Sequence, residues 1–192
     1  GTSGTMAGIQ SARMCIKTII VEETPWLGGM MTSAGVSAID GNHSLPSGLW
    51  AEFRNELIKH YGSEEALASG WVSKVMFEPA VAQKILREMC AKEKNLSIIS
   101  SVKVLNIKKK SESWTVDFSD NIIINAKILI DGTELGDVAA KVGVKYDIGM
   151  ESKATYNERI APEKANNIIQ DLTYVAVLKE YNREVTIRKP IN

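Results

Sequence analysis

The sequence predicts an α/β fold with a small antiparallel β-meander, and three observations carry this prediction. The chain opens on a glycine-rich stretch, Gly1-Thr-Ser-Gly4, which leads through a helical pattern into the β-branched run Thr18-Ile-Ile-Val21. After Asn95 the apolar period changes to two, as in successive strands. A fuller apolar segment, 126–130, then runs into a small-residue turn and another helical pattern. Helical and strand patterns in this order are typical of the α/β class.

The composition is that of a soluble globular protein of one domain or slightly more. The chain has 192 residues, of which 44% are hydrophobic and 24% charged. Lys plus Arg and Asp plus Glu each number 23, so no net field favours nucleic acid or an anionic membrane. Cys15 and Cys90 lack metal-ligand spacing, and we expect two small buried side chains and no metal site.

The first stretch matches the later part of a dinucleotide-binding fingerprint. A full fingerprint is G-x-G-x-x-G after a strand, opening a helix, with an acidic residue about 20 positions later. Gly1 and Gly4 have the spacing of its second and third glycines, and Glu22 stands where the ribose-binding carboxylate is expected. Small residues let the backbone approach phosphates at a helix N-terminus. Taken alone, the match is equally compatible with a glycine-rich start to an ordinary helix.

A helix and a loop surround the β-branched run. We expect the helix over 4–14, with a C-cap near Cys15, where glycine would suit a left-handed conformation. The loop 23–35 is rich in small residues, and its Gly28-Gly29 pair allows close backbone approach. Such a loop is either functional or a plain connector.

Two long helices are predicted in the middle of the chain. The polar loop 40–46 precedes the first of them, 48–61, and contains His43, which is either a surface residue or a catalytic one. The second helix, 79–94, has proline in its first turn and an apolar stripe. Its charged side chains, Arg87 among them, are expected on a solvated face.

Strand patterns follow. They are expected at 96–99, 102–107, 114–118 and 122–124. Polar turns separate the last three, as in an antiparallel meander. The segment 126–130 is expected at the centre of a sheet covered on both faces. It leads into the turn 131–137 and the helical pattern 138–143, which is the layout of a ligand site at the carboxyl edge of a sheet.

The order of these motifs resembles the FAD-dependent oxidoreductases of the glutathione-reductase-like superfamily, in particular the bacterial family with an L-G-G-M loop. The resemblance covers most of residues 1–143. The motifs that carry it are Gly1-Thr-Ser-Gly4, Val21-Glu22, Leu27-Gly-Gly-Met30 with Thr32-Ser-Ala-Gly35, Phe77-Glu-Pro79, and Ile130-Asp-Gly-Thr-Glu-Leu-Gly-Asp137. It implies a Rossmann-like FAD-binding domain and FAD as the cofactor.

The resemblance also implies roles for single residues. Glycines and the first loop bind the pyrophosphate, and a carboxylate binds the ribose. A backbone position in the meander contacts adenine, and the small-residue turn closes over the cofactor. The cofactor-binding residues so implied are Gly1, Gly4, Glu22, Gly28, Gly29, Met30, Thr32, Val104, Thr133 and Asp137. His43 and Asp40, in the loop after the flavin-contacting segment, are candidates for a catalytic base.

Three features depart from the family pattern. The first strand and first glycine of the fingerprint are missing, Cys15 stands where glycine is usual, and the chain ends before the family completes its flavin site. We therefore expect an incomplete FAD-binding domain over 1–143 and the truncated beginning of a substrate or cap domain over 144–192. Without the first strand, the edge of its neighbour in the sheet would be exposed. A homo-oligomer is one assembly that would cover this edge.

The function expected of the intact protein is that of an FAD-dependent oxidoreductase, which transfers a hydride between a small-molecule substrate and flavin. One alternative is a Rossmann protein that uses only NAD, against which the L-G-G-M loop and the meander argue. Another is a catalytically incompetent fragment or an interaction module of the same fold. We expect neither nucleic acid nor membrane as a partner, and both a cytoplasmic and an exported location stay open.

Overall fold

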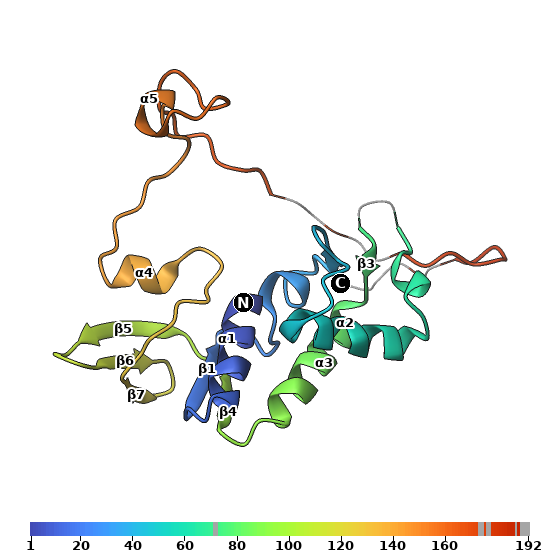
Figure 1. The fold of residues 1–192 in the computed structure, drawn as a ribbon, viewed down its shortest axis with the longest axis horizontal. Coiled ribbons are helices and arrows are strands. Elements are labelled where there is room, and N and C mark those ends of the chain that lie inside the picture. Colours follow the sequence, from blue (N-terminus) through green and yellow to red (C-terminus); the bar gives the residue numbers. More distant parts are fainter. Residues whose placement is uncertain (71–72, 173–174, 176–177, 187, 189–192) are drawn as a thin grey trace.

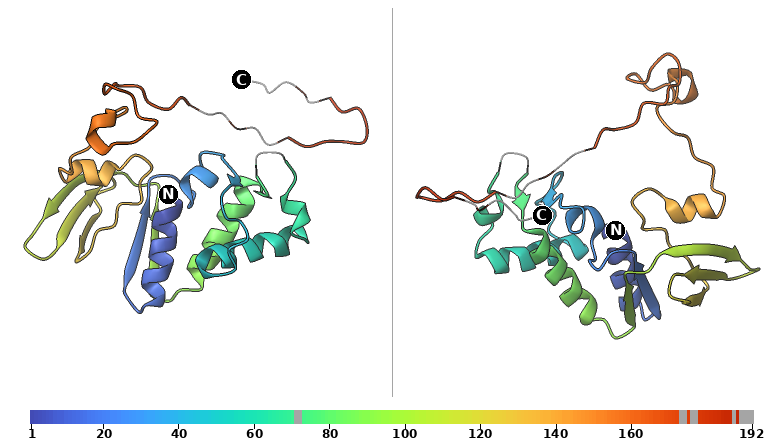
Figure 2. Two further views of the ribbon diagram at one scale, coloured as in Figure 1. Left: turned by 45° about the horizontal axis from the view of Figure 1, so that its top comes forward. Right: turned by 180° about the vertical axis from the view of Figure 1, so that it is seen from behind.

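The computed structural model describes residues 1–70, 73–172, 175, 178–186 and 188. A helix and a pair of strands form its centre, with two long helices on one side and a three-stranded sheet on the other (Figure 1). Figure 2 shows the same arrangement from two other directions. The predicted α/β class with a small antiparallel meander is confirmed.

The central unit consists of helix α1 and the parallel strands β1 and β4. Helix α1 spans Thr2–Arg13, β1 spans Thr18–Glu22 and β4 spans Leu96–Ser100, with Thr18 opposite Leu96 and Glu22 opposite Ser100. Small residues bring α1 close to β1, since a Cβ on Gly8 would lie 2.5 Å from Cγ1 of Ile20. The absence of a side chain at Gly8 therefore lets the helix pack directly on the strand.

The main hydrophobic core lies between this unit and the helices α2 and α3. Helix α2 spans Gly48–Tyr61 and α3 spans Pro79–Ala91. Phe53 and Leu57 of α2 and Leu86 of α3 are almost fully buried. The rings of Phe53 and Phe77 pack edge to face, with their centroids 5.7 Å apart. The short elements around them are η1 Gly29–Met31, η2 Glu65–Leu67, and the antiparallel strands β2 Ala38–Ile39 and β3 Val75–Met76.

The antiparallel sheet is the predicted meander. It contains β5 Val104–Lys109, β6 Trp114–Phe118 and β7 Ile123–Ala126. Asp120 and Asn121, between β6 and β7, have positive φ angles of 58° and 59°, which suits a tight hairpin turn. A second small core of Val102, Val116 and Phe118 packs on this sheet. Helix α4, Asp137–Lys141, follows it.

The prediction of a central strand at 126–130 is wrong. Strand β7 ends at Ala126, and the residues directly after it form no strand. Ile128 and Ile130 are 73% and 56% exposed, whereas Leu129 packs against the second core. In the described chain the sheet of β1 and β4 has two strands, and this segment pairs with neither of them. An apolar run becomes a buried strand only where a neighbouring strand is present.

Residues 144–172 contain little regular structure. Helix α5 spans Lys153–Tyr156, and an isolated antiparallel bridge joins Met150 to Asn166. Large apolar side chains are exposed here, Leu172 by 87%. The domain division after residue 143 stays a prediction, and the positions of the expected second domain that lie outside the described residues are 173–174, 176–177, 187 and 189–192. Among the described helices, none has the length and apolar character needed to cross a bilayer.

The end of α1 has a left-handed residue at Cys15. Its φ angle is 63°, and the N–H of Ile16 donates to the carbonyl oxygen of Ser11 at 3.2 Å, which closes the helix end. The predicted left-handed position is confirmed, but the predicted burial of Cys15 is wrong because the side chain turns outward. Cys90 is buried as predicted, and burial raises the pKa of its thiol to about 11.

Replacing Cys15 with glycine is expected to raise the free energy of unfolding by about 1 kcal/mol, because glycine adopts this conformation without the Cβ penalty. Urea denaturation followed by circular dichroism measures the change. The matched control is Cys15→Ser, which keeps a Cβ and should leave the stability near that of the wild type. A glycine variant no more stable than the serine variant would show that the cap is unstrained.

Candidate functional site

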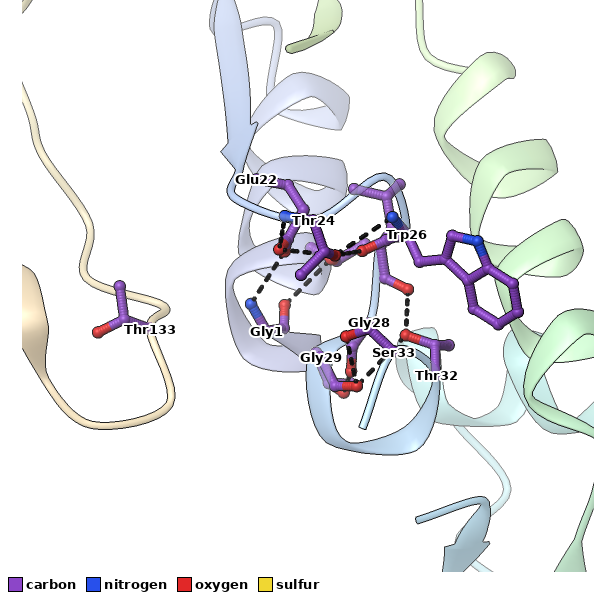
Figure 3. Close-up of polar contacts among 12 residues, drawn as sticks. Gly1, Glu22, Thr24, Trp26, Gly28, Gly29, Thr32, Ser33 and Thr133 are labelled. Atoms are coloured by element: carbon purple, nitrogen blue, oxygen red, sulfur yellow. Dashed lines mark hydrogen bonds and ion pairs between the residues drawn. The ribbon is translucent and has the colours of Figure 1, made fainter. Parts of the chain in front are cut away.

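Three backbone turns meet at the N-terminal end of α1. They are the first turn of α1, the turn at Gly28-Gly29, and the turn at 131–134. The first turn of α1, Met30 and residues 132–134 line a pocket of about 370 Å³. Figure 3 shows Gly29 beside Gly1, with Thr133 on a separate loop. Parts of three motifs that are far apart in the sequence therefore lie together.

Glycines allow these turns to touch backbone to backbone. A Cβ on Gly132 would lie 2.5 Å from the Cα of Gly4, and one on Gly1 would lie 2.8 Å from the carbonyl oxygen of Gly132. A Cβ on Gly29 would lie 2.8 Å from the Cα of Gly1. At these distances a side chain would collide with backbone atoms that cannot rotate away. Gly1, Gly29 and Gly132 are therefore required for the turns to approach one another as closely as they do.

The first turn of α1 presents backbone donors to the pocket. The first hydrogen bond within the helix runs from the N–H of Thr5 to the carbonyl oxygen of Gly1 at 3.1 Å. The N–H groups of residues 2–4 therefore have no acceptor within the helix. The hydroxyl of Thr2 donates to the carbonyl oxygen of Gly28 at 2.6 Å and ties α1 to the neighbouring turn. The positive end of the helix dipole and these donors favour an anionic group such as a phosphate.

A carboxylate at the end of β1 faces the same helix end. Oε2 of Glu22 forms an ion pair with the N-terminal amino group of Gly1, at a distance of 3.5 Å. Oε1 accepts hydrogen bonds from the N–H of Thr24 at 3.0 Å and from its hydroxyl at 3.1 Å (Figure 3). The Glu22 side chain is 11% exposed, and both of its oxygens have partners: Oε1 accepts from Thr24, and Oε2 pairs with the amino group at the helix end.

The L-G-G-M loop is fixed by its own backbone geometry. Gly28 and Gly29 have positive φ angles of 106° and 55°, which suit glycine. The hydroxyl of Thr32 donates to the carbonyl oxygen of Leu27 at 2.6 Å, and Thr32 is buried. Met30 is half-exposed and lines the pocket. Among the residues predicted to contact a cofactor, Met30 borders the pocket, Gly29 packs on its wall, and Thr32 supports the loop from within.

A carboxylate organises the third turn. Oδ1 of Asp131 accepts hydrogen bonds from the N–H and the hydroxyl of Thr133 at 2.9 and 2.7 Å, and Oδ2 accepts from the N–H of Ala139 at 2.8 Å. Burial acts to raise the pKa of Asp131, but hydrogen bonds from Thr133, Ala139 and Val138 outweigh it and lower the pKa. The carboxylate thus holds Thr133 at the pocket wall.

Acidification is expected to loosen this turn. A carboxyl group whose pKa is lowered by folding stabilises the fold above its unfolded pKa, and this contribution is lost as the pH falls through the folded pKa. Asp131→Asn should therefore lower stability at neutral pH and flatten the acid limb of the stability curve, measured by urea denaturation between roughly pH 3 and pH 7. Asp120→Asn, in the exposed β6–β7 turn, is the control. Identical acid limbs for Asp131→Asn and the wild type would contradict this role.

The predicted residues Asp40, His43, Val104 and Asp137 do not line the pocket. Asp40 is exposed and His43 is half-buried, both in the loop after β2. Val104 lies in β5 opposite Phe118, and Asp137 is exposed at the start of α4, where its N–H donates to the Thr133 hydroxyl at 2.8 Å. Their predicted roles stay predictions.

Sequence reasoning missed Thr2, Ser3, Thr24 and Gly132 of the site. Thr2 and Ser3 occupy the variable positions between the two glycines, where the fingerprint carries no side-chain signal. Thr24 follows the ribose carboxylate by two residues and has no motif of its own. Gly132 was named from the sequence only as a member of the turn motif and was given no role. Its position between Asp131 and Thr133 was the one feature that could have identified it.

Comparison with known protein families gives one match over almost the whole chain. The family described as FAD dependent oxidoreductase matches residues 1–191. This match includes the glycine turns, the carboxylate at the end of β1, and the residues expected to begin a second domain. The search of curated proteins finds no match to the chain.

Solved structures resemble the chain at low sequence identity. The crystal structure of p-nitrophenol 4-monooxygenase PnpA from Pseudomonas putida DLL-E4 aligns with a TM-score of 0.52 and 14% identity, over 78% of this chain and 43% of that chain. The Diels-Alderase PyrE3 of the pyrroindomycin biosynthetic pathway aligns with a TM-score of 0.47 and 15% identity, over 79% of this chain and 35% of that chain. The chain spans less than half the length of either protein, and the first likeness shows a shared fold.

Proposed function

The chain belongs to the FAD-dependent oxidoreductase family, and from this premise we propose that the pocket at the N-terminal end of α1 holds the adenosine diphosphate half of FAD. FAD is the cofactor of this family. One observation carries the proposal: a helix N-terminus, backbone-packed glycines and an oriented carboxylate meet at one place. These groups complement the charge and the hydroxyl groups of that half of the cofactor.

Each part of the ligand has a matching group in the chain. The N–H groups of residues 2–4 suit the pyrophosphate, and the glycines give its oxygens access to the backbone. Oε2 of Glu22 suits a ribose hydroxyl, because a carboxylate oxygen has two lone pairs and the amino group of Gly1 is its one partner among the described residues. A backbone contact of Val104 with adenine remains part of the proposal. Met30 and Thr133 would border the path toward the flavin.

For the intact protein we propose oxidation or reduction of a small-molecule substrate. When bound, FAD supplies a ring that accepts or donates a hydride. The residues of this chain bind and orient the cofactor. Asp40 and His43, in the loop after β2, are the candidates for holding the proton that leaves or joins the substrate.

A second candidate function concerns this chain by itself. A chain that is catalytically incompetent would bind the adenosine end of FAD but turn over no substrate. The observation that favours this candidate is the unpaired segment 127–130, whose exposed Ile128 and Ile130 lack the strand neighbour that a complete parallel sheet would provide. A protein that uses only NAD would bind at the same helix end, so the two cofactors must be compared directly.

Titration of the chain with FAD, FMN and NAD, followed by isothermal calorimetry, tests the proposal. We expect one FAD per chain and tighter binding of FAD than of FMN, which lacks the adenosine half. Equal affinities for FAD and FMN would place recognition on the flavin and contradict the proposed site. Tighter binding of NAD than of FAD would favour the NAD alternative.

A further inference from the structure

Helix α3 holds the loop that joins Glu22 to the glycine pair. Oε1 of Gln83 accepts a hydrogen bond from the N–H of Leu27 at 2.7 Å. Nη2 of Arg87 donates to the carbonyl oxygen of Pro25 at 3.0 Å. Because α3 is anchored in the main core, these bonds attach the loop to a rigid element.

The contacts come from neighbouring positions on α3. Gln83 and Arg87 are four residues apart and therefore share a helix face. Between them, Leu86 packs directly on the loop, since its Cδ1 lies 2.7 Å from the position of a Cβ on Gly28. Arg87 is exposed as predicted, yet its guanidinium group also donates to Oγ of Ser100 at the end of β4 at 3.1 Å. Arg87, on the predicted solvated face, thus binds both the loop and the end of a strand.

The Leu27 residue is fixed on both sides of its backbone. Gln83 binds its N–H, and the hydroxyl of Thr32 binds its carbonyl oxygen at 2.6 Å. Its side chain is fully buried in the main core. Because Leu27 directly precedes Gly28, its placement determines whether Gly29 can pack against Gly1.

We propose that Gln83 is a positioning residue of the cofactor site, and that Arg87 supports the same loop. Gln83 holds Leu27 in the position that packs the glycine pair against the N-terminal end of α1, where the pyrophosphate binds. Supporting hydrogen bonds of this kind set the geometry of binding groups without touching the ligand. This inference rests on the proposed function.

The test compares Gln83→Met, which loses the acceptor, with Gln83→Glu, which keeps an acceptor at the same place. In Gln83→Met we expect hydrogen exchange at the Leu27 amide to be at least about tenfold faster and the Kd for FAD to rise about tenfold. Both quantities should stay near wild type in Gln83→Glu. Lys84→Met, at the adjacent exposed position of α3, controls for the loss of a polar side chain.

Each outcome decides the proposal. Unchanged Leu27 exchange in Gln83→Met, or faster exchange with unchanged FAD affinity, would overturn it, and so would loss of both properties in Gln83→Glu. If Gln83→Met does not fold, Arg87→Met tests the same loop at Pro25, and FAD affinity equal to wild type there would overturn the proposal. Failure of the wild-type chain to bind FAD would instead overturn the proposed function, and this inference with it.

Discussion

Replacing Gly132 with alanine is expected to weaken FAD binding by at least about tenfold, equivalent to roughly 1.4 kcal/mol. The added Cβ would lie 2.5 Å from the Cα and 2.9 Å from the nitrogen of Gly4. Neither atom can move without displacing α1, so the turn at 131–134 must move away from the helix N-terminus. Fluorescence titration of the variant with FAD measures the loss.

Gly62→Ala is the matched control for this substitution. Gly62 caps α2 with a φ angle of 91°, and an added Cβ would meet nothing within 4 Å. The control should therefore lose about 1 kcal/mol of stability through backbone strain and keep its FAD affinity. Equal FAD affinities for Gly132→Ala and the wild type would mean that the third turn takes no part in binding.

Replacing Glu22 with glutamine is expected to weaken FAD binding by about ten- to a hundredfold, because a hydrogen bond to a charged acceptor contributes roughly 1.5–3 kcal/mol. Glutamine has the same shape and can still accept from Thr24, so the loop should keep its conformation. The loss should be much smaller for an FAD analogue that lacks the adenosine ribose hydroxyls, and a double-mutant cycle with that analogue isolates the contact.

The neighbouring carboxylate provides the control. Glu23 is exposed and pairs with Lys103 at 3.1 Å on the surface, where ion pairs contribute little. Glu23→Gln should therefore leave FAD affinity unchanged. If Glu22→Gln and Glu23→Gln behaved alike, the carboxylate at the end of β1 would have no specific role in ribose binding.

Local patterns in the sequence were sufficient for much of the fold. The helix Gly48–Tyr61 and the order of the meander strands follow from apolar periods and from turn residues, which depend on neighbours in the sequence. The left-handed cap at Cys15 follows from the abrupt change from helix to strand. The strand predicted at 126–130 failed because strand formation depends on a partner elsewhere in the structure.

The support of the site could not be predicted for the same reason. Gln83 and Leu27 are 56 residues apart, and a glutamine on a helix surface carries no signal for a hydrogen bond to a distant loop. Gly4 and Gly132 each permit close approach, but the sequence does not say which backbone approaches which. Spacing identified the motifs, whereas their mutual packing required the folded structure.

An NMR titration of the isotope-labelled chain with FAD tests the central claim most directly, because amide shifts report weak binding as well as tight binding. The account predicts that the largest shifts occur at the amides of Thr2, Ser3, Gly4, Gly29 and Thr133. The groove between α2 and α3, lined in part by Glu56, His60 and Lys84, should show none. Shifts confined to that groove, or unchanged amides in the first turn of α1 at saturating FAD, would contradict the account.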